Sequence, residues 1–140
     1  MTSRDQIAAR RVEGVERIAV VRANGLGDLM FVLPALDALR ATYPAAEIVL
    51  LGGPLPEELL ATRPSAVDRV LRPPVWRGVW SPAGQEPDDG ATDAFFARMQ
   101  AEGFDLALQL HGGGANSNPF TARLGARLTA GLRAPDAATG

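Results

Sequence analysis

Three short apolar segments predict the buried strands of this chain. They are RIAVV at 17–21, EIVLL at 47–51 and DLALQL at 105–110, and each is followed by glycines. None alternates apolar with polar residues, a pattern typical of parallel strands that are covered on both faces. A fourth segment, VDRVL at 67–71, predicts one more short strand.

Apolar positions with the period of an α-helix lie between the first two strands: Leu29, Val32, Leu33, Leu36 and Leu39. Tyr43-Pro44 ends this helix, because the residue before a proline disfavours the α conformation. Pro34 falls inside the pattern, and it predicts either a kink or a helix that starts after Asp28.

Three more helices complete the pattern. Pro56 suits the first position of one, and Gly103 closes another that begins near Ala91. The last is expected near Phe120–Leu128, with Ser117 or Asn118 as its cap.

This order of strands and helices predicts an α/β fold, a Rossmann-like doubly wound parallel sheet with right-handed crossovers. We expect a polar N-terminal extension at 1–16, one domain at 17–132 and a polar tail at 133–140. The chain has 140 residues, enough for one such domain.

Composition removes several kinds of chemistry. The net charge of −2 gives no field that attracts nucleic acid. All fourteen basic residues are arginine and there is no cysteine, so Schiff-base lysine, thiolate and disulfide chemistry are excluded. The N-terminus lacks the apolar core of a signal peptide, and no apolar run approaches the roughly 18 residues of a membrane span. We therefore expect a cytoplasmic protein.

Glycine-rich segments follow each of the three main strands: NGLGD at 24–28, GG at 52–53 and HGGG at 111–114. In open α/β sheets, ligands bind beyond the carboxyl ends of the strands. Glycines there let backbone N–H groups approach a ligand closely. The three segments together predict a binding crevice at this edge of the sheet.

A dinucleotide site fits this crevice poorly. The fingerprint G-x-G-x-x-G needs a third glycine where this chain has Met30. The acid that binds the ribose belongs at the end of the second strand, whereas Glu47 stands at its start. A dinucleotide-dependent oxidoreductase is therefore the weakest of the functions considered.

Asp28 has two interpretations that do not exclude each other. An aspartate before an apolar helix is a favoured N-cap, typically contributing about 1 kcal/mol. A carboxylate at the edge of a crevice is also placed to act as a general base toward a bound hydroxyl.

His111 and the segment 73–91 supply the other polar candidates. His111, the single histidine, either contacts a ligand or bonds to backbone, and without partners it makes no metal site. Trp76 and Trp80 lie beside Arg72 and Arg77 in the long segment. They predict a lip that stacks on sugar and grips phosphate, a loop that covers the sheet edge, or a surface that docks another domain.

The stretch from Arg17 to Leu132 resembles the N-terminal domain of glycosyltransferase family 9, the ADP-heptose:lipopolysaccharide heptosyltransferases and their relatives. The resemblance rests on Gly27-Asp28 after the first strand and on Leu33-Pro34-Ala35-Leu36 in the helix. The segment FDLALQLHGGGANSNPFTARLGAR at 104–127 continues it.

This resemblance implies one half of a GT-B glycosyltransferase that acts in lipopolysaccharide or cell-envelope glycan synthesis. The reaction is inverting and metal-independent, with no cofactor besides a nucleotide-sugar donor such as ADP-heptose. The catalytic base corresponds to Asp28. The substrate-binding positions correspond to Asn24, Gly25, Gly27, Arg72, Arg77, His111 and Gly112.

The resemblance also implies partners. The acceptor is a sugar or lipid-linked glycan at the inner face of the membrane, and a second domain binds the donor. That C-terminal domain is absent from the 140 residues, so we expect the chain alone to be inactive. A non-catalytic Rossmann-like binding module is the alternative from another functional class.

Overall fold

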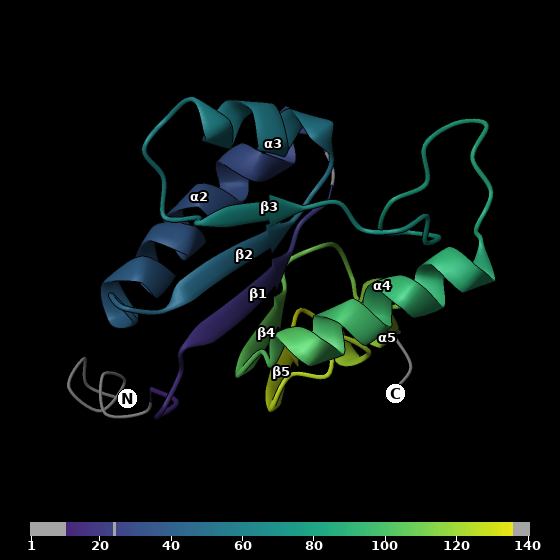
Figure 1. The fold of residues 1–140 in the computed structure, drawn as a ribbon. Coiled ribbons are helices and arrows are strands. Elements are labelled where there is room, and N and C mark those ends of the chain that lie inside the picture. The colour runs from purple at the N-terminus through teal and green to yellow at the C-terminus, as the bar shows by residue number, and fades with distance from the viewer. Residues whose placement is uncertain (1–10, 24, 136–140) are drawn as a thin grey trace.

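The computed structural model describes residues 11–23 and 25–135, which form one parallel five-stranded sheet with helices on both faces (Figure 1). The strand order is β3-β2-β1-β4-β5, and every neighbouring pair is parallel. The strands are β1 (Arg17–Val21), β2 (Glu47–Leu51), β3 (Arg69–Leu71), β4 (Leu106–Gln109) and β5 (Leu128–Gly131).

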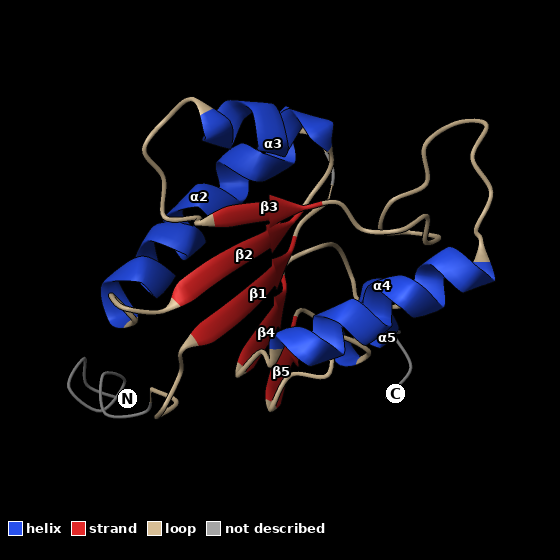
Figure 2. Ribbon diagram, viewed as in Figure 1, coloured by secondary structure: helices blue, strands red, loops and turns tan. Residues whose placement is uncertain are grey.

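Figure 2 shows α2 and α3 on one face of the sheet, and α4 and α5 on the other. The bounds of the helices are Leu26–Thr42 for α2, Pro54–Ala61 for α3, Asp89–Glu102 for α4 and Ser117–Ala122 for α5. From β1 the chain moves outward to β3, and it then crosses back to β4 and β5. Right-handed crossovers in opposite directions place their helices on opposite faces, so the predicted doubly wound fold is confirmed.

Each face of the sheet packs a separate apolar core. Ile18 and Val20 of β1 pack with α2, whereas Ala19 and Val21 pack with α4 and α5. All four side chains are fully buried. Burial on both faces explains why these strands have continuous apolar sequences instead of alternating ones.

Aromatic rings dominate the core beneath α4 and α5. The Phe96 and Phe120 ring centroids lie 5.1 Å apart, with the planes inclined by 65°. Trp76 joins them, with its centroid 5.4 Å from that of Phe120. Edge-to-face pairs of this kind contribute stability beyond the area they bury. Of the interpretations left open for the loop, Trp76 therefore fits the one in which it packs over the sheet.

The interpretation of Asp28 as the N-cap is wrong, and so is one of the two alternatives given for Pro34, a helix that starts after Asp28. The helix begins at Leu26 with Gly25 as its N-cap, and no side chain caps it. Asp28 instead lies in the first turn. Pro34 lies inside the helix on its exposed side. The backbone carbonyl that lacks a donor because proline has no N–H can there accept a hydrogen bond from water.

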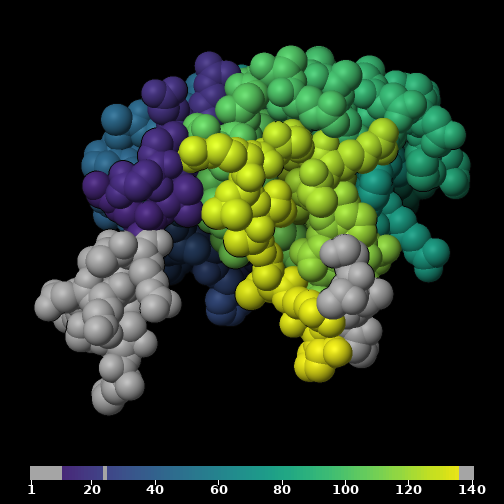
Figure 3. All heavy atoms as spheres, turned by 90° about the horizontal axis from the view of Figure 1, so that it is seen from below, coloured from purple at the N-terminus to yellow at the C-terminus, as the bar shows by residue number. Residues whose placement is uncertain are grey.

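The helix expected near Phe120–Leu128 is also placed wrongly. α5 covers Ser117–Ala122 with Asn116 as its N-cap, and Gly125 then turns the chain with φ of 76°. Leu128 belongs to β5, a strand that the sequence pattern did not predict. In Figure 3 the yellow C-terminal segment, which includes β5, lies at the surface. An exposed edge strand lacks the apolar run that identified the buried ones.

Carboxylates join the elements at the amino edge of the sheet. Glu102 accepts a hydrogen bond from Arg69 at 2.8 Å, and Asp105 accepts from the Glu16 and Arg17 backbone N–H groups at 2.8 and 3.0 Å. The Arg69 bond lowers the pKa of Glu102, and the Glu16 bond lowers that of Asp105. Both groups therefore contribute stability above their ordinary pKa values, and acidification through the lowered values removes it.

Replacing Phe120 should test the aromatic core. Phe120→Ala removes a fully buried ring, and we expect the free energy of unfolding to fall by about 3–5 kcal/mol. The control Phe31→Ala removes a ring that is 87% exposed, so its effect should stay within about 0.5 kcal/mol. Urea unfolding followed by circular dichroism measures both, and equal losses would contradict the assigned core.

Candidate functional site

The candidate site lies where the carboxyl ends of β1 and β4 meet. These strands are neighbours, yet β1 leads to α2 on one face and β4 leads to α5 on the other. Such a reversal of strand order opens a crevice where α/β proteins bind ligands. Two segments enter it: the described residues of the β1–α2 loop, Arg22, Ala23 and Gly25, and the glycine loop at 111–116.

Hydrogen bonds join these two loops directly. The backbone N–H of Ala23 donates to Nδ1 of His111 at 3.2 Å. The Arg22 side chain donates from Nη1 to the backbone oxygen of Leu110 at 2.9 Å. The end of β1 is therefore held to the end of β4 beyond the last strand pair.

Arg22 also holds Asp28. Its Nη2 lies 2.5 Å from Oδ1 of Asp28, and the two side chains are 17% and 44% exposed. The carboxylate is thus fixed on one side and reaches solvent at the carboxyl edge of the sheet. A carboxylate in this position is accessible from solvent, which a general base toward a bound hydroxyl needs.

His111 is a buried histidine that bridges backbone groups. Besides the Ala23 contact, it makes a hydrogen bond with the Gly78 backbone. Burial lowers its pKa, and Arg22 lowers it further, while the Gly78 bond and Asp28 act in the opposite direction. The ring is therefore neutral at pH 7. Because Nδ1 accepts a hydrogen bond, its proton is on Nε2.

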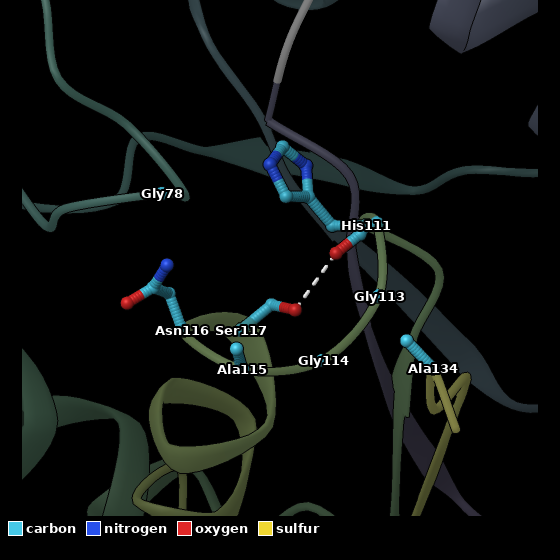
Figure 4. Close-up of a pocket in the computed structure, with 9 residues that line it drawn as sticks. Gly78, His111, Gly113, Gly114, Ala115, Asn116, Ser117 and Ala134 are labelled. Atoms are coloured by element: carbon cyan, nitrogen blue, oxygen red, sulfur yellow. Dashed lines mark hydrogen bonds between the residues drawn. The ribbon is translucent and has the colours of Figure 1, made fainter. Parts of the chain in front are cut away.

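A cavity of about 250 Å³ lies beside His111 (Figure 4). Its lining residues are Gly78, His111, Gly112, Gly113, Gly114, Ala115, Asn116, Ser117 and Ala134. The walls are mostly backbone, with polar side chains from His111, Asn116 and Ser117. The volume lies just below the range of about 300–1,000 Å³ typical of ligand pockets, so the cavity suits one small polar group.

The tryptophan hairpin, residues 76–80, contributes Gly78 to the wall of this cavity. Trp76 and Trp80 make an antiparallel bridge, and Trp76 Nε1 donates to the Asn116 backbone oxygen at 3.1 Å. Trp80 lies on Gly53, where a Cβ would come within 2.6 Å of its ring. Gly78 at the tip has φ of 80°, and a Cβ there would come within 2.6 Å of Asn116. The hairpin thus spans from the end of β2 to the glycine loop.

The predicted site residues that the structure describes fall into separate groups. Gly25, Gly27 and Asp28 form the start of α2, and His111 and Gly112 line the cavity. Asn24 lies outside the described residues.

The two predicted arginines behave differently. Arg77 is exposed beside Gly78 at the hairpin tip, and no described carboxylate pairs with it. Arg72 instead pairs with Glu57 at 3.0 Å on an exposed surface. Arg72 is thus engaged in an ion pair, and Arg77 lies next to Gly78, which lines the cavity.

Two residues of the site were missed by the sequence analysis. Arg22 follows directly after a buried strand, and this position was the available signal. Gln109 is fully buried, accepts from the His111 N–H at 2.5 Å and donates to Asn118 at 2.9 Å. A glutamine inside the apolar segment DLALQL was the signal for this buried network.

Two other kinds of feature are absent from the described residues. No group of three or more histidine or acidic side chains there is arranged to hold a metal ion. No helix in this part of the chain has both the length and the apolar character to cross a membrane.

Comparison with solved structures identifies the fold. The chain matches a structure described as the glycosyl transferase family 9 from Veillonella parvula DSM 2008, with a TM-score of 0.66 and 19% sequence identity. The match covers 84% of this chain and 32% of that one, so this chain spans about a third of the length of the structure it matches. Neither protein-family models nor curated protein sequences give a match.

This likeness confirms the predicted fold class and the predicted resemblance to family 9 in structure. At 19% identity the match establishes the fold and does not carry activity to this chain.

Substituting Gly78 should test how the tip of the tryptophan hairpin packs against Asn116. Gly78→Ala and the control Gly84→Ala both place a side chain at positive φ, 80° and 77°, at a cost of about 1–2 kcal/mol. Only at Gly78 would the new Cβ meet Asn116, at 2.6 Å, whereas Gly84 has open space. Urea unfolding should therefore show an additional loss of about 1–3 kcal/mol for Gly78→Ala. Equal losses would contradict this packing.

Proposed function

We propose that this chain is the acceptor-binding domain of an inverting, nucleotide-sugar-dependent glycosyltransferase, with Asp28 as its general base. One observation carries the proposal: a partly exposed carboxylate, fixed by Arg22, stands at the crevice of a fold like that of family 9. The β1–α2 loop and the glycine loop would surround the acceptor sugar.

The chemistry follows from the position of Asp28. The carboxylate takes the proton of an acceptor hydroxyl while that oxygen attacks the anomeric carbon of the donor sugar. The bond from this carbon to the nucleotide diphosphate breaks, and attack from the opposite face inverts the configuration. Arg22 keeps the carboxylate oriented, which reduces the entropy lost on reaching the reactive geometry.

We assign donor binding to a second domain, as in GT-B enzymes. The donor would be ADP-heptose or a similar nucleotide sugar, and its departing diphosphate needs electrostatic stabilisation. Asp28 by itself supplies only the base, so this domain on its own should not transfer sugar. The chain would contribute the acceptor site and the proton acceptor.

A lipid-linked glycan at the cytoplasmic face of the membrane is the acceptor we favour. Leu26, Met30 and Phe31 are 49%, 58% and 87% exposed, and they lie on the first two turns of α2 around Asp28. Exposed apolar side chains beside a polar site suit a ligand with an apolar part. Arg77, at the hairpin tip, would pair with an acidic group on the glycan.

A non-catalytic Rossmann-like binding module is the second candidate. The observation that favours it is the Arg22–Asp28 ion pair, because a carboxylate that is paired with a guanidinium group already has a structural role. A dinucleotide-dependent oxidoreductase remains the weakest candidate. The end of β2 carries Gly53 beneath the Trp80 ring, where a ribose-binding acid would be needed.

Asp28→Asn separates the enzyme from the module. In a protein that joins this domain to a donor-binding domain, we expect the substitution to lower kcat by about 10²–10⁴-fold, because the amide cannot take the proton. The KM for the acceptor should change little. Asp37→Asn, at an exposed position of the same helix, serves as the matched control and should keep full activity.

Transfer rates with a nucleotide sugar and an envelope glycan measure both variants. Full activity of Asp28→Asn would remove the catalytic assignment and leave the binding module. The amide NMR signals of Gly25, Gly27 and Gly112 report glycan binding by the 140-residue chain itself. Unchanged signals across a range of envelope glycans would contradict the acceptor site.

Titration with NAD(H) tests the oxidoreductase. Both tryptophans lie in the hairpin at the crevice, so a cofactor bound there should quench their emission. We expect no saturable quenching at micromolar cofactor. Saturable quenching that is lost when Gly53 is replaced by a larger residue would support the dinucleotide site instead.

A further inference from the structure

We propose that His111 is a positioning residue that couples the tryptophan hairpin to the loop carrying Asp28. The catalytic meaning of this coupling rests on the proposed function, while the coupling itself is a property of the fold. His111 would not contact the acceptor as a catalytic group. Its ring would instead transmit the position of the hairpin to the candidate base.

The imidazole is bonded on two sides. Nδ1 accepts the Ala23 N–H at 3.2 Å, and the ring also bonds to the Gly78 backbone. In Figure 4 the ring extends from the glycine loop into the space on the side of Gly78. A neutral ring has one acceptor and one donor nitrogen, so the Ala23 bond leaves Nε2–H for Gly78. One side chain thus joins two loops that are far apart in sequence.

The backbone of His111 is held in place by buried polar groups. Its N–H donates to Oε1 of Gln109 at 2.5 Å, and its carbonyl oxygen accepts from the Ser117 hydroxyl at 2.7 Å. Gln109 and Ser117 are both buried. Breaking either of these buried hydrogen bonds would leave an unsatisfied polar group. The backbone of His111 is therefore held in one position, and the ring is attached to a fixed point of the loop.

From His111, the path to Asp28 is short. Ala23 is buried, and its carbonyl oxygen accepts from the Gly53 N–H at 3.2 Å. Arg22 precedes Ala23 and carries the ion pair to Asp28. A shift of the Ala23 backbone therefore moves the guanidinium group that orients the carboxylate.

The other end of the path lies at the cavity. Gly78 and His111 both line it, and the hairpin is anchored through Trp76 to Asn116. A ligand in the cavity meets the hairpin tip and the imidazole at once. Occupying the cavity would thus change how Arg22 presents Asp28.

Protonation of His111 should break this link. The charged groups that face the ring are Arg22 at the end of β1 and Asp28 on α2, and the Gly78 backbone faces it from the hairpin. Its pKa lies below the ordinary 6.5, so the neutral ring contributes stability that is complete above about pH 6.5. That stability is lost as pH falls toward the lowered value, because imidazolium cannot accept the Ala23 N–H.

Amide NMR of the 140-residue chain tests the coupling without any sugar. We expect the backbone amide signals of Ala23, Asp28 and Gly78 to titrate with the His111 ring signals, at one midpoint below 6.5. Signals of Ala23 or Asp28 that stay unchanged while the ring titrates would overturn the proposal. This measurement needs no variant, so a failure of a variant to fold cannot obscure it.

Two variants separate the halves of the link. The amide oxygen of His111→Asn stands near the position of Nδ1 and keeps an acceptor for Ala23. The amide nitrogen of His111→Gln stands near Nε2 and keeps a donor for Gly78. We expect hydrogen exchange of the Ala23 amide to speed up by about tenfold in His111→Gln and to stay slow in His111→Asn.

Tryptophan emission reports the other half of the link. Its maximum should shift in His111→Asn, which lacks the donor for Gly78, and should shift less in His111→Gln, which keeps one. Identical behaviour of both variants in both measurements would overturn the proposal. The outcome is independent of the proposed function. If Asp28→Asn leaves sugar transfer intact while the coupling is observed, the glycosyltransferase assignment fails and the positioning role of His111 stands.

Discussion

The parallel pairing of β1 with β4 is the constraint on which the candidate site depends. Its register sets Val21 beside Gln109, so the residues that follow, 22–23 and 110–111, leave the sheet side by side. The Leu110 N–H bonds to the Val21 carbonyl at 3.1 Å and extends the pairing by one step. A slip of one residue would turn each β4 side chain to the opposite face and separate Ala23 from His111. Core packing on both faces prevents that slip.

Buried polar groups determine the shape of the site, in addition to the apolar packing of the sheet. Gln109 interrupts an apolar strand, yet both ends of its amide are bonded, to the His111 N–H and to Asn118. Leaving such groups unpaired would cost about 1–3 kcal/mol each, which favours one arrangement of the glycine loop over its alternatives. The glycines provide backbone freedom, and the buried amide selects which conformation is used. A preorganised cavity is the consequence.

Sequence reasoning failed where neighbouring elements override local preference. Asp28 has the pattern of an N-cap, but α2 starts two residues earlier and its carboxylate turns to Arg22. Leu128 continued an expected helix, but Gly125 breaks it and the pairing with Leu106 makes the segment a strand. Arg22 lies only six positions before Asp28 but outside the helix, and Leu106 lies on a neighbouring strand. In both cases a contact outside the local pattern overrides the local preference.

The sequence by itself determined the buried strands, the doubly wound fold and the glycine segments at the carboxyl edge with Asp28 among them. These depend on local periodicity and on residues such as glycine and proline, whose backbone preferences act within a few positions. Only the tertiary structure decided that Arg22 holds Asp28, that His111 accepts from Ala23 and that Trp76 packs against Phe120. Ala23 and His111 are 88 positions apart, and strand order alone brings them together. Contacts of that range leave no periodic trace in the chain, because either residue alone is compatible with many partners.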